Sequence, residues 1–268
     1  MPRLKLELEY DGGAFVGWQV QPNGVSVQSV VERALQTLLG APTPVECAGR
    51  TDSGVHAERQ VIAFDTERTL PMKAYVQGLG SLLPDEVCVV SAAEVSEDFD
   101  PRRWARGKRY RYRILNRAVR SPLHRRTHWE VFVPLDAAAM REAAQHLLGR
   151  HDFSAFRAAD CQARHPVRTI TALSIEPRGR EELEITVEGT AFLKHMVRNL
   201  VGTLVEVGRG KRSPSWVAQV LASRDRSLAG RTAPAQGLTL VEVFYDDAPP
   251  HAPPNRGPST VAGPDDGR

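Results

Sequence analysis

The chain has 268 residues, of which 41% are hydrophobic and 25% charged, and its formal net charge is +3. This composition is typical of a soluble globular protein with one large or two ordinary domains. The sequence contains no apolar stretch of about 18 residues and no signal-peptide core, so we expect no contact with a membrane. The three cysteines, Cys47, Cys88 and Cys161, are far apart and lack CxxC spacing. This favours a reduced, cytoplasmic compartment.

Alternating and helical periodicities predict the elements of the first half. Leucines alternate along residues 4–10, as in a half-buried strand, and a loop rich in glycine follows at 11–24. Ser26 is placed to cap a helix that ends at Gly40. The remaining predicted elements are strands at 45–48 and 60–64, a helix at 71–83 and a strand at 86–95.

The segment between the strands at 45–48 and 60–64 contains an Arg, an Asp, a His and two glycines. The glycines permit positive φ values and close approach by another group. Arg50 lies two residues from Asp52, near enough to favour an ionised carboxylate, which would suit a nucleophile or a general base. The alternative is structural: Asp52 and Thr51 cap a turn, and Arg50 pairs with a surface acid.

Residues 101–129 contain eleven Lys or Arg residues and no Asp or Glu. Within this segment, residues 108–114 alternate as a strand that separates two faces. One face carries the three arginines Arg109, Arg111 and Arg113. The other face carries the tyrosines, with Lys108, Tyr110, Tyr112 and Ile114. Guanidinium groups bind phosphates, and aromatic rings stack on unpaired bases, so this pattern favours nucleic acid. The alternative is an amphipathic edge strand with a solvated arginine face.

The second half repeats a mixture of strands and helices. We expect helices at 135–148, 191–207 and 214–222, and strands at 167–175, 183–189 and 238–245. The two halves divide near residues 104–108. The chain is therefore predicted to form an N-terminal α+β domain at 1–105, a C-terminal α+β domain at 106–247 and a disordered, proline-rich tail at 248–268.

Four motifs, in order and spacing, resemble those of the TruA-type tRNA pseudouridine synthases. They are Gly-Arg-Thr-Asp-Ser-Gly-Val-His-Ala at 49–57, Arg-Tyr-Arg-Tyr at 109–112, Phe-Leu-Lys-His-Met-Val-Arg-Asn at 192–199 and Gly-Leu-Thr-Leu at 237–240. The resemblance covers about residues 4–245. It implies two related α+β domains with antiparallel mixed sheets flanked by helices and a basic catalytic cleft between them. It also implies a homodimer that binds one tRNA across both subunits.

The resemblance further implies that the protein isomerises uridine to pseudouridine at positions 38, 39 and 40 in the anticodon stem-loop of tRNA, without a cofactor. Asp52 matches the catalytic aspartate, which attacks either C6 of the uracil or C1′ of its ribose. The residues that match substrate-binding positions are Arg50, which displaces the base, Tyr110, which stacks on it, Arg198, which pairs with the catalytic carboxylate, and Leu238, which lines the base pocket. The face formed by Arg109, Arg111 and Arg113 is the predicted contact with the RNA backbone.

One departure and two alternatives bear on this interpretation. Relatives often read Phe-His-Ala-Arg-Phe before the basic strand, whereas this chain has Asp100 and Pro101 there. A non-catalytic RNA-binding module would explain the basic strand but not the Asp52 loop. A metal-dependent nuclease would need a cluster of carboxylates, which is missing near Asp52 in the sequence. His56 has no third ligand at zinc-like spacing, so we expect it to hold the loop rather than a metal.

Overall fold

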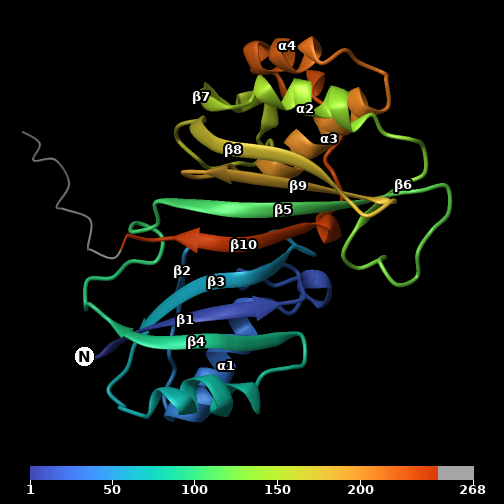
Figure 1. Cartoon of the computed structure of the whole chain (residues 1–268). Helices are drawn as coiled ribbons and strands as arrows, with labels where there is room; N and C mark the ends of the chain where they lie inside the picture. The colour runs from blue at the N-terminus through green and yellow to red at the C-terminus, as the bar shows by residue number, and fades with distance from the viewer. Residues whose placement is uncertain (247–268) are drawn as a thin grey trace, which may run out of the picture.

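The computed structural model describes residues 1–246 and shows an α+β fold, as expected (Figure 1). The strands are β1 (Arg3–Tyr10), β2 (Glu46–Cys47), β3 (His56–Asp65), β4 (Val87–Val95), β5 (Gly107–Asn116), β6 (Trp129–Val131), β7 (Gly149–Asp152), β8 (Val167–Arg178), β9 (Glu182–Gly189) and β10 (Leu238–Phe244). The α-helices are α1 (Val27–Leu39), α2 (Ala137–Gln145), α3 (Met196–Gly208) and α4 (Ser215–Ser223). The short helices are η1 (Gly12–Ala14), η2 (Ala74–Gly78), η3 (Ser154–Phe156), η4 (Arg226–Leu228) and η5 (Ala235–Gly237). The predicted tail at 248–268 lies outside the described residues.

One sheet runs through both halves of the chain in the order β4-β1-β3-β10-β5-β9-β8-β7, with β2 on β3 and β6 on β5 (Figure 1). The pairs β3–β10 and β5–β6 are parallel, and the other pairs are antiparallel. The last strand, β10, therefore lies between β3 of the first half and β5 of the second. Its Thr239 is opposite His56 on one side and Arg111 on the other.

Local sequence explains why the first helix forms where it does. Ser26 accepts a hydrogen bond from the Ser29 amide and the Ser29 side chain accepts one from the Ser26 amide, so two otherwise unpaired donors of the first turn are satisfied. Gly40 ends α1 in the left-handed region at φ 82°. The apolar face of α1 and the alternating leucines of β1 are both buried in the same hydrophobic core. Burial of each such leucine contributes about 1.5–3 kcal/mol.

The structure differs from the predicted elements in four places. The helix predicted at 191–207 begins only at Met196, because His195 has a left-handed backbone (φ 61°, ψ 3°). Part of the helix predicted at 71–83 has π-helical hydrogen bonding, over Ala74–Gly78. The strand predicted at 60–64 is longer: β3 begins at His56, so the motif at 49–57 that carries Asp52 ends inside it. Finally, β6 and β7 are short strands that were not predicted, and they pair with β5 and β8.

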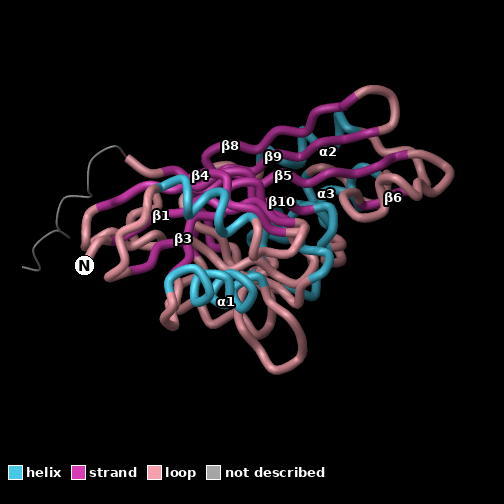
Figure 2. The backbone as a smooth tube through the Cα atoms, turned by 90° about the horizontal axis from the view of Figure 1, so that it is seen from below, coloured by secondary structure: helices cyan, strands magenta, loops and turns pink. Residues whose placement is uncertain are grey.

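The helices α1 and α3 lie on the same side of the sheet (Figure 2). On β5 the side chains alternate as expected, with Tyr110, Tyr112 and Ile114 buried and the intervening arginines partly exposed. Among residues 1–246 no helix is long and apolar enough to cross a membrane. The three cysteines are unpaired.

Asp100 has a local structural role in the loop that departs from the expected pattern. Its carboxylate accepts hydrogen bonds from the amides of Arg102 and Arg103, at 2.8 and 2.9 Å, and caps the turn that follows Pro101. The Pro101 carbonyl accepts a 2.6 Å hydrogen bond from the Tyr245 hydroxyl. The Asp100 side chain thus caps the turn, and a backbone carbonyl of the same loop is joined to Tyr245, the residue that follows β10.

Candidate active site

A cleft of about 1330 Å³ opens between the two halves of the sheet, on the side that carries Tyr110. Residues from both halves line it. The lining includes five residues that the sequence predicted as catalytic or substrate-binding: Arg50, Asp52, Tyr110, Arg198 and Leu238. The structure thus brings together side chains that lie as much as 188 positions apart, from residue 50 to residue 238.

The loop that carries Asp52 is held by backbone contacts to the preceding glycine-rich loop. The Trp18 amide donates to the Thr51 carbonyl at 3.0 Å, and the Val55 amide donates to the Asp52 carbonyl at 3.1 Å. Gly17, at φ 112°, forms a β-bridge with Asp52, and a Cβ there would lie 2.9 Å from the Thr51 carbonyl oxygen. The close approach of these two loops fixes where Asp52 sits.

The two glycines of the motif serve the two purposes expected of them. Gly54 has φ 77°, a conformation that lets the chain turn back toward β3. A Cβ on Gly49 would lie 2.3 Å from Nζ of Lys108. Gly49 therefore leaves the space in which the lysine amine reaches the floor of the cleft.

The Asp52 carboxylate is partly buried, with 24% of its side chain exposed, and two cationic or potentially cationic groups contact it. Arg198 donates from Nη1 to Oδ2 at 3.2 Å, and its Nε donates to the Ala233 carbonyl at 2.8 Å. His195 places Nε2 at 3.5 Å from the same carboxylate oxygen. Arg50, in contrast, is exposed at the cleft and forms no ion pair with Asp52, so the partner suggested by proximity in the sequence is not the one in the structure.

His195 is the contact that sequence reasoning missed. It lies three residues before Arg198, a spacing that places two side chains on one face of a helix and could have drawn attention to it. Burial lowers the pKa of His195, and the neighbouring Asp52 opposes that shift. Arg198 and Lys194 add to the lowering. The imidazole is therefore mainly neutral at pH 7.

Tyr110 and Leu238 contribute to the apolar part of the cleft. The Tyr110 ring packs edge-on against Phe192, with centroids 5.0 Å apart and an interplanar angle of 81°. Burial raises the pKa of the Tyr110 hydroxyl, and the nearby Asp52 carboxylate acts in the same direction. The hydroxyl is therefore protonated at neutral pH. Leu238 is 5% exposed and opens β10 beside these rings.

Further basic residues line the cleft. Lys108 lies on the same face of β5 as Tyr110, and its Nζ donates to the Ala48 carbonyl at 2.7 Å. No acid within residues 1–246 pairs with it, and burial lowers the pKa of Lys108 to about 8. Arg102 is exposed at the same cleft, and Arg168 contributes a buried Nε with no hydrogen-bond partner in the described part of the chain. Such cations without acidic partners provide sites for phosphate oxygens.

Comparison with known proteins gives the family. A family model described as tRNA pseudouridine synthase matches residues 143–246. The chain is 66% identical to tRNA pseudouridine synthase A of Myxococcus xanthus over 267 residues, which is 100% of both chains. It belongs to the TruA-type tRNA pseudouridine synthases. The corresponding proteins of Pelobacter propionicus and Geobacter sulfurreducens are each 51% identical over 245 residues, which is 91% of this chain and 100% of each relative.

The arginine face of β5 in this synthase does not line the cleft. Its side chains point to the opposite side of the sheet and meet acids from neighbouring strands. Arg109 pairs with Glu188 at 2.7 Å and Glu242 at 2.8 Å. Arg111 pairs with Glu58, and Arg113 is 3.9 Å from Glu184. The positive charge that the sequence concentrates in one strand is thus largely neutralised by strands that are distant in the sequence.

His56 anchors the end of the loop that carries Asp52, which is the role expected for it. Its Nδ1 accepts a hydrogen bond from the Gly12 amide at 3.1 Å. On the other side of the ring, Nε2 lies 2.8 Å from the Arg126 carbonyl and 3.1 Å from that of Gln236. The ring therefore joins η1, β3 and the segment before β10. Within residues 1–246, no group of three or more His, Cys, Asp or Glu side chains is arranged to hold a metal ion.

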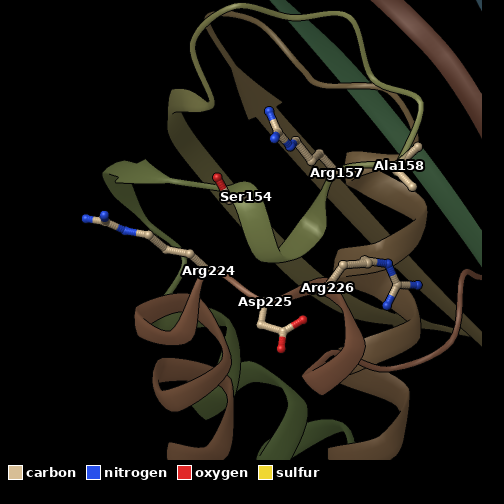
Figure 3. Close-up of a pocket in the computed structure, with 7 residues that line it drawn as sticks. Ser154, Arg157, Ala158, Arg224, Asp225 and Arg226 are labelled. Atoms are coloured by element: carbon tan, nitrogen blue, oxygen red, sulfur yellow. The ribbon is translucent and has the colours of Figure 1, made fainter.

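A second hollow of the synthase, of about 410 Å³, lies between η3 and the segment that follows α4 (Figure 3). Arg224 and Arg226 point away from each other on its rim (Figure 3). Arg224 is 3.3 Å from Asp152, and Arg226 donates to the Gly230 carbonyl at 2.9 Å. These arginines are engaged in holding the segment after α4, and none of the residues predicted as catalytic lines this hollow.

Proposed function

We propose that this synthase isomerises uridines at positions 38, 39 and 40 in the anticodon stem-loop of tRNA, with Asp52 as the nucleophile. The observation that supports this most directly is the position of the Asp52 carboxylate. It lies in a cleft beside a cationic partner, with the ring of Tyr110 and the side chain of Leu238 lining the same cleft. The stem-loop positions follow from the family resemblance.

A uridine within a stem must leave the stack before its ring can be reached. In our proposal Arg50, exposed at the cleft, displaces the base, and Tyr110 stacks on the flipped ring beside Leu238. These contacts compensate part of the stacking lost in the RNA. Arg198 neutralises Asp52 and holds it in position through a hydrogen bond of 3.2 Å.

Asp52 then attacks C6 of the uracil or C1′ of the ribose. The bond between N1 of the base and C1′ of the ribose breaks, the base turns, and C5 forms a new bond to C1′. The bond to Asp52 breaks again, the proton on C5 is lost and N1 gains a proton. Product and substrate have the same composition, so the reaction needs no redox cofactor. Because the pKa of Tyr110 is raised, its hydroxyl is available as a protonated hydrogen-bond donor to the base.

The cleft cations Arg102, Lys108 and Arg168 are proposed to hold the RNA backbone. We do not retain Arg109, Arg111 and Arg113 in that role, because they lie on the other side of the sheet in ion pairs with glutamates. We expect a cytoplasmic homodimer that binds one tRNA across two subunits, as the family resemblance implies.

The test is to map pseudouridine in unmodified tRNA by carbodiimide adducts and primer extension, with and without EDTA. The matched proteins are wild type and Asp52→Asn, which has nearly the same shape. Primer-extension stops that mark pseudouridine at positions 38–40, seen with wild type alone, would support the proposal. Tight tRNA binding without stops in either protein would favour an RNA-binding module. Cleavage that EDTA abolishes would favour a metal-dependent nuclease.

A further inference from the structure

The two protein contacts of the Asp52 carboxylate converge on one of its oxygens. Arg198 Nη1 lies 3.2 Å from Oδ2, and His195 Nε2 lies 3.5 Å from the same atom. Within residues 1–246 no hydrogen bond reaches Oδ1. The carboxylate is therefore held asymmetrically, with Oδ2 bound to the protein and Oδ1 left for another partner.

The backbone of His195 is unusual in a way that matches this contact. It adopts φ 61° and ψ 3°, a left-handed conformation that is rare for a residue other than glycine or asparagine. Such conformations persist where the surroundings hold them, and they cluster at functional sites. Here the His195 carbonyl accepts from the Asn199 amide at 2.9 Å, so the residue begins α3 while its ring faces Asp52.

The charges around the imidazole come from three segments. Asp52 faces it from the catalytic loop, Asp160 from the segment after η3, and Lys194 and Arg198 from its own segment. Burial and the two cations lower the pKa of His195, and the two carboxylates oppose them. A neutral imidazole carries one N–H, which can donate to a carboxylate without adding a second full charge.

We infer that His195 is a positioning residue for the reaction: its neutral ring donates from Nε2 to Oδ2 of Asp52 and, with Arg198, turns Oδ1 toward the substrate. This rests on the proposed role of Asp52 as the nucleophile. Protonation of the ring would place a second cation beside the carboxylate and make its oxygens less nucleophilic. The rate of the chemical step therefore falls as the pH decreases through the pKa of His195.

Glutamine and asparagine give a matched pair of variants that do not titrate. The amide nitrogen of glutamine occupies nearly the place of Nε2, whereas asparagine is one methylene shorter and does not reach Asp52. Asparagine, however, tolerates the left-handed backbone better. A loss of activity in His195→Asn alone is therefore due to the missing contact and not to backbone strain.

The experiment measures single-turnover tritium release from tRNA labelled at C5 of uridine, between pH 5 and 8, together with tRNA binding. We expect His195→Asn to be slower by roughly tenfold to a hundredfold, the effect of losing one hydrogen bond to a charged group, with unchanged tRNA affinity. His195→Gln should keep most of the rate at pH 7. It should also lose the fall in rate that wild type shows between pH 7 and 5.

Two results would overturn the inference. One is a wild-type rate in His195→Asn, and the other is a wild-type fall in rate below pH 7 in His195→Gln. If His195→Asn does not fold, as judged by its thermal unfolding, the pH profile of His195→Gln decides alone. Activity in Asp52→Asn would remove the proposed nucleophile and this inference with it. An inactive Asp52→Asn beside a fully active His195→Asn would overturn the role of His195 only.

Discussion

Arg198 and Asp52 lie 146 positions apart in the chain, and the Nη1 atom of Arg198 donates to Oδ2 of Asp52 at 3.2 Å. The same guanidinium donates from Nε to the Ala233 carbonyl at 2.8 Å. Arg198 therefore joins three segments: the loop that carries Asp52, α3 and the chain that leads into β10. The contact to Ala233 fixes the direction from which the arginine approaches the carboxylate.

We predict that Arg198→Lys keeps the charge but slows the chemical step. A lysine amine is a point charge without the rigid fork of guanidinium, so it cannot bind the Ala233 carbonyl and Asp52 in the same geometry. We expect the single-turnover rate to fall roughly tenfold to a hundredfold, with tRNA affinity within about twofold of wild type. Arg209→Lys, at the other end of α3, is the control. Equal rates in both variants would contradict the role of Arg198.

Tyr110 should act through its ring and a protonated hydroxyl. Because burial raises its pKa, the hydroxyl stays protonated up to at least pH 9. The ratio of the wild-type rate to the Tyr110→Phe rate should therefore be constant between pH 7 and 9. Tyr110→Leu removes the ring and should cost about tenfold or more beyond Tyr110→Phe, as expected for lost base stacking. A ratio that changes across this pH range would show that the hydroxyl ionises there.

Lys108 should make the stability of the protein depend on pH. Its pKa is about 8 in the folded state, below the ordinary value of 10.5. The unfolded chain therefore keeps this proton up to a higher pH than the folded protein does. As the pH rises from about 8 to about 10.5, the penalty for burying the charged amine disappears and the free energy of unfolding rises. In Lys108→Met this penalty is absent. Lys108→Met should be more stable than wild type below pH 8. The difference in unfolding free energy between the two proteins should decrease by about 3 kcal/mol at most between pH 8 and about 10.5.

Urea unfolding of wild type and Lys108→Met at pH 7.5 and 10 measures this difference. Lys73→Met, at an exposed lysine, is the control and should show no such change. A difference between wild type and Lys108→Met that stays the same at both pH values would mean that Lys108 has an ordinary pKa.

The two sides of the sheet should differ in their effect on tRNA binding. Arg102→Gln removes a cation from the cleft and should reduce the slope of log affinity against log salt by about one. Arg111→Gln removes the partner of Glu58 and should cost about 1–2 kcal/mol in stability, with little change in tRNA affinity. Filter binding between 50 and 200 mM salt compares them. A matching loss of affinity in Arg111→Gln would show that RNA reaches the arginine face.

Local patterns were sufficient to predict much of the fold. The alternation at residues 4–10, the cap at Ser26 and the glycine after α1 are properties of neighbouring residues, and the structure has them as expected. The site residues came from motifs, and the five that were predicted around the cleft do line it. The strand at 4–10 and the ends of α1 depend on the backbone period and on short-range hydrogen bonds.

Composition and periodicity could not identify partners from distant segments. The run of cations at 101–129 contains no acid, and only the assembled sheet brings Glu188 and Glu242 to Arg109. The left-handed backbone of His195 interrupts a pattern that is helical by period, and it depends on packing around α3. The proximity of Arg50 to Asp52 in sequence suggested an ion pair, whereas the partner of Asp52 in the structure is Arg198, the residue that the family resemblance implied.

The position of β10 also determines when the site can form. The strands β3 and β5 do not pair with each other, and β10 joins them. A growing polypeptide completes β3 long before residues 238–244 are made. The start of β3, at His56 and Ala57, therefore lacks its β10 partner through most of synthesis, although β2 can already pair with Ile62 and Ala63. Until β10 is made, Leu238 is absent from the cleft and Arg198 does not approach Asp52. Assembly of the cleft is thus tied to the synthesis of β10, and a product truncated before β10 would leave open the strand edges that β10 joins and have no assembled cleft.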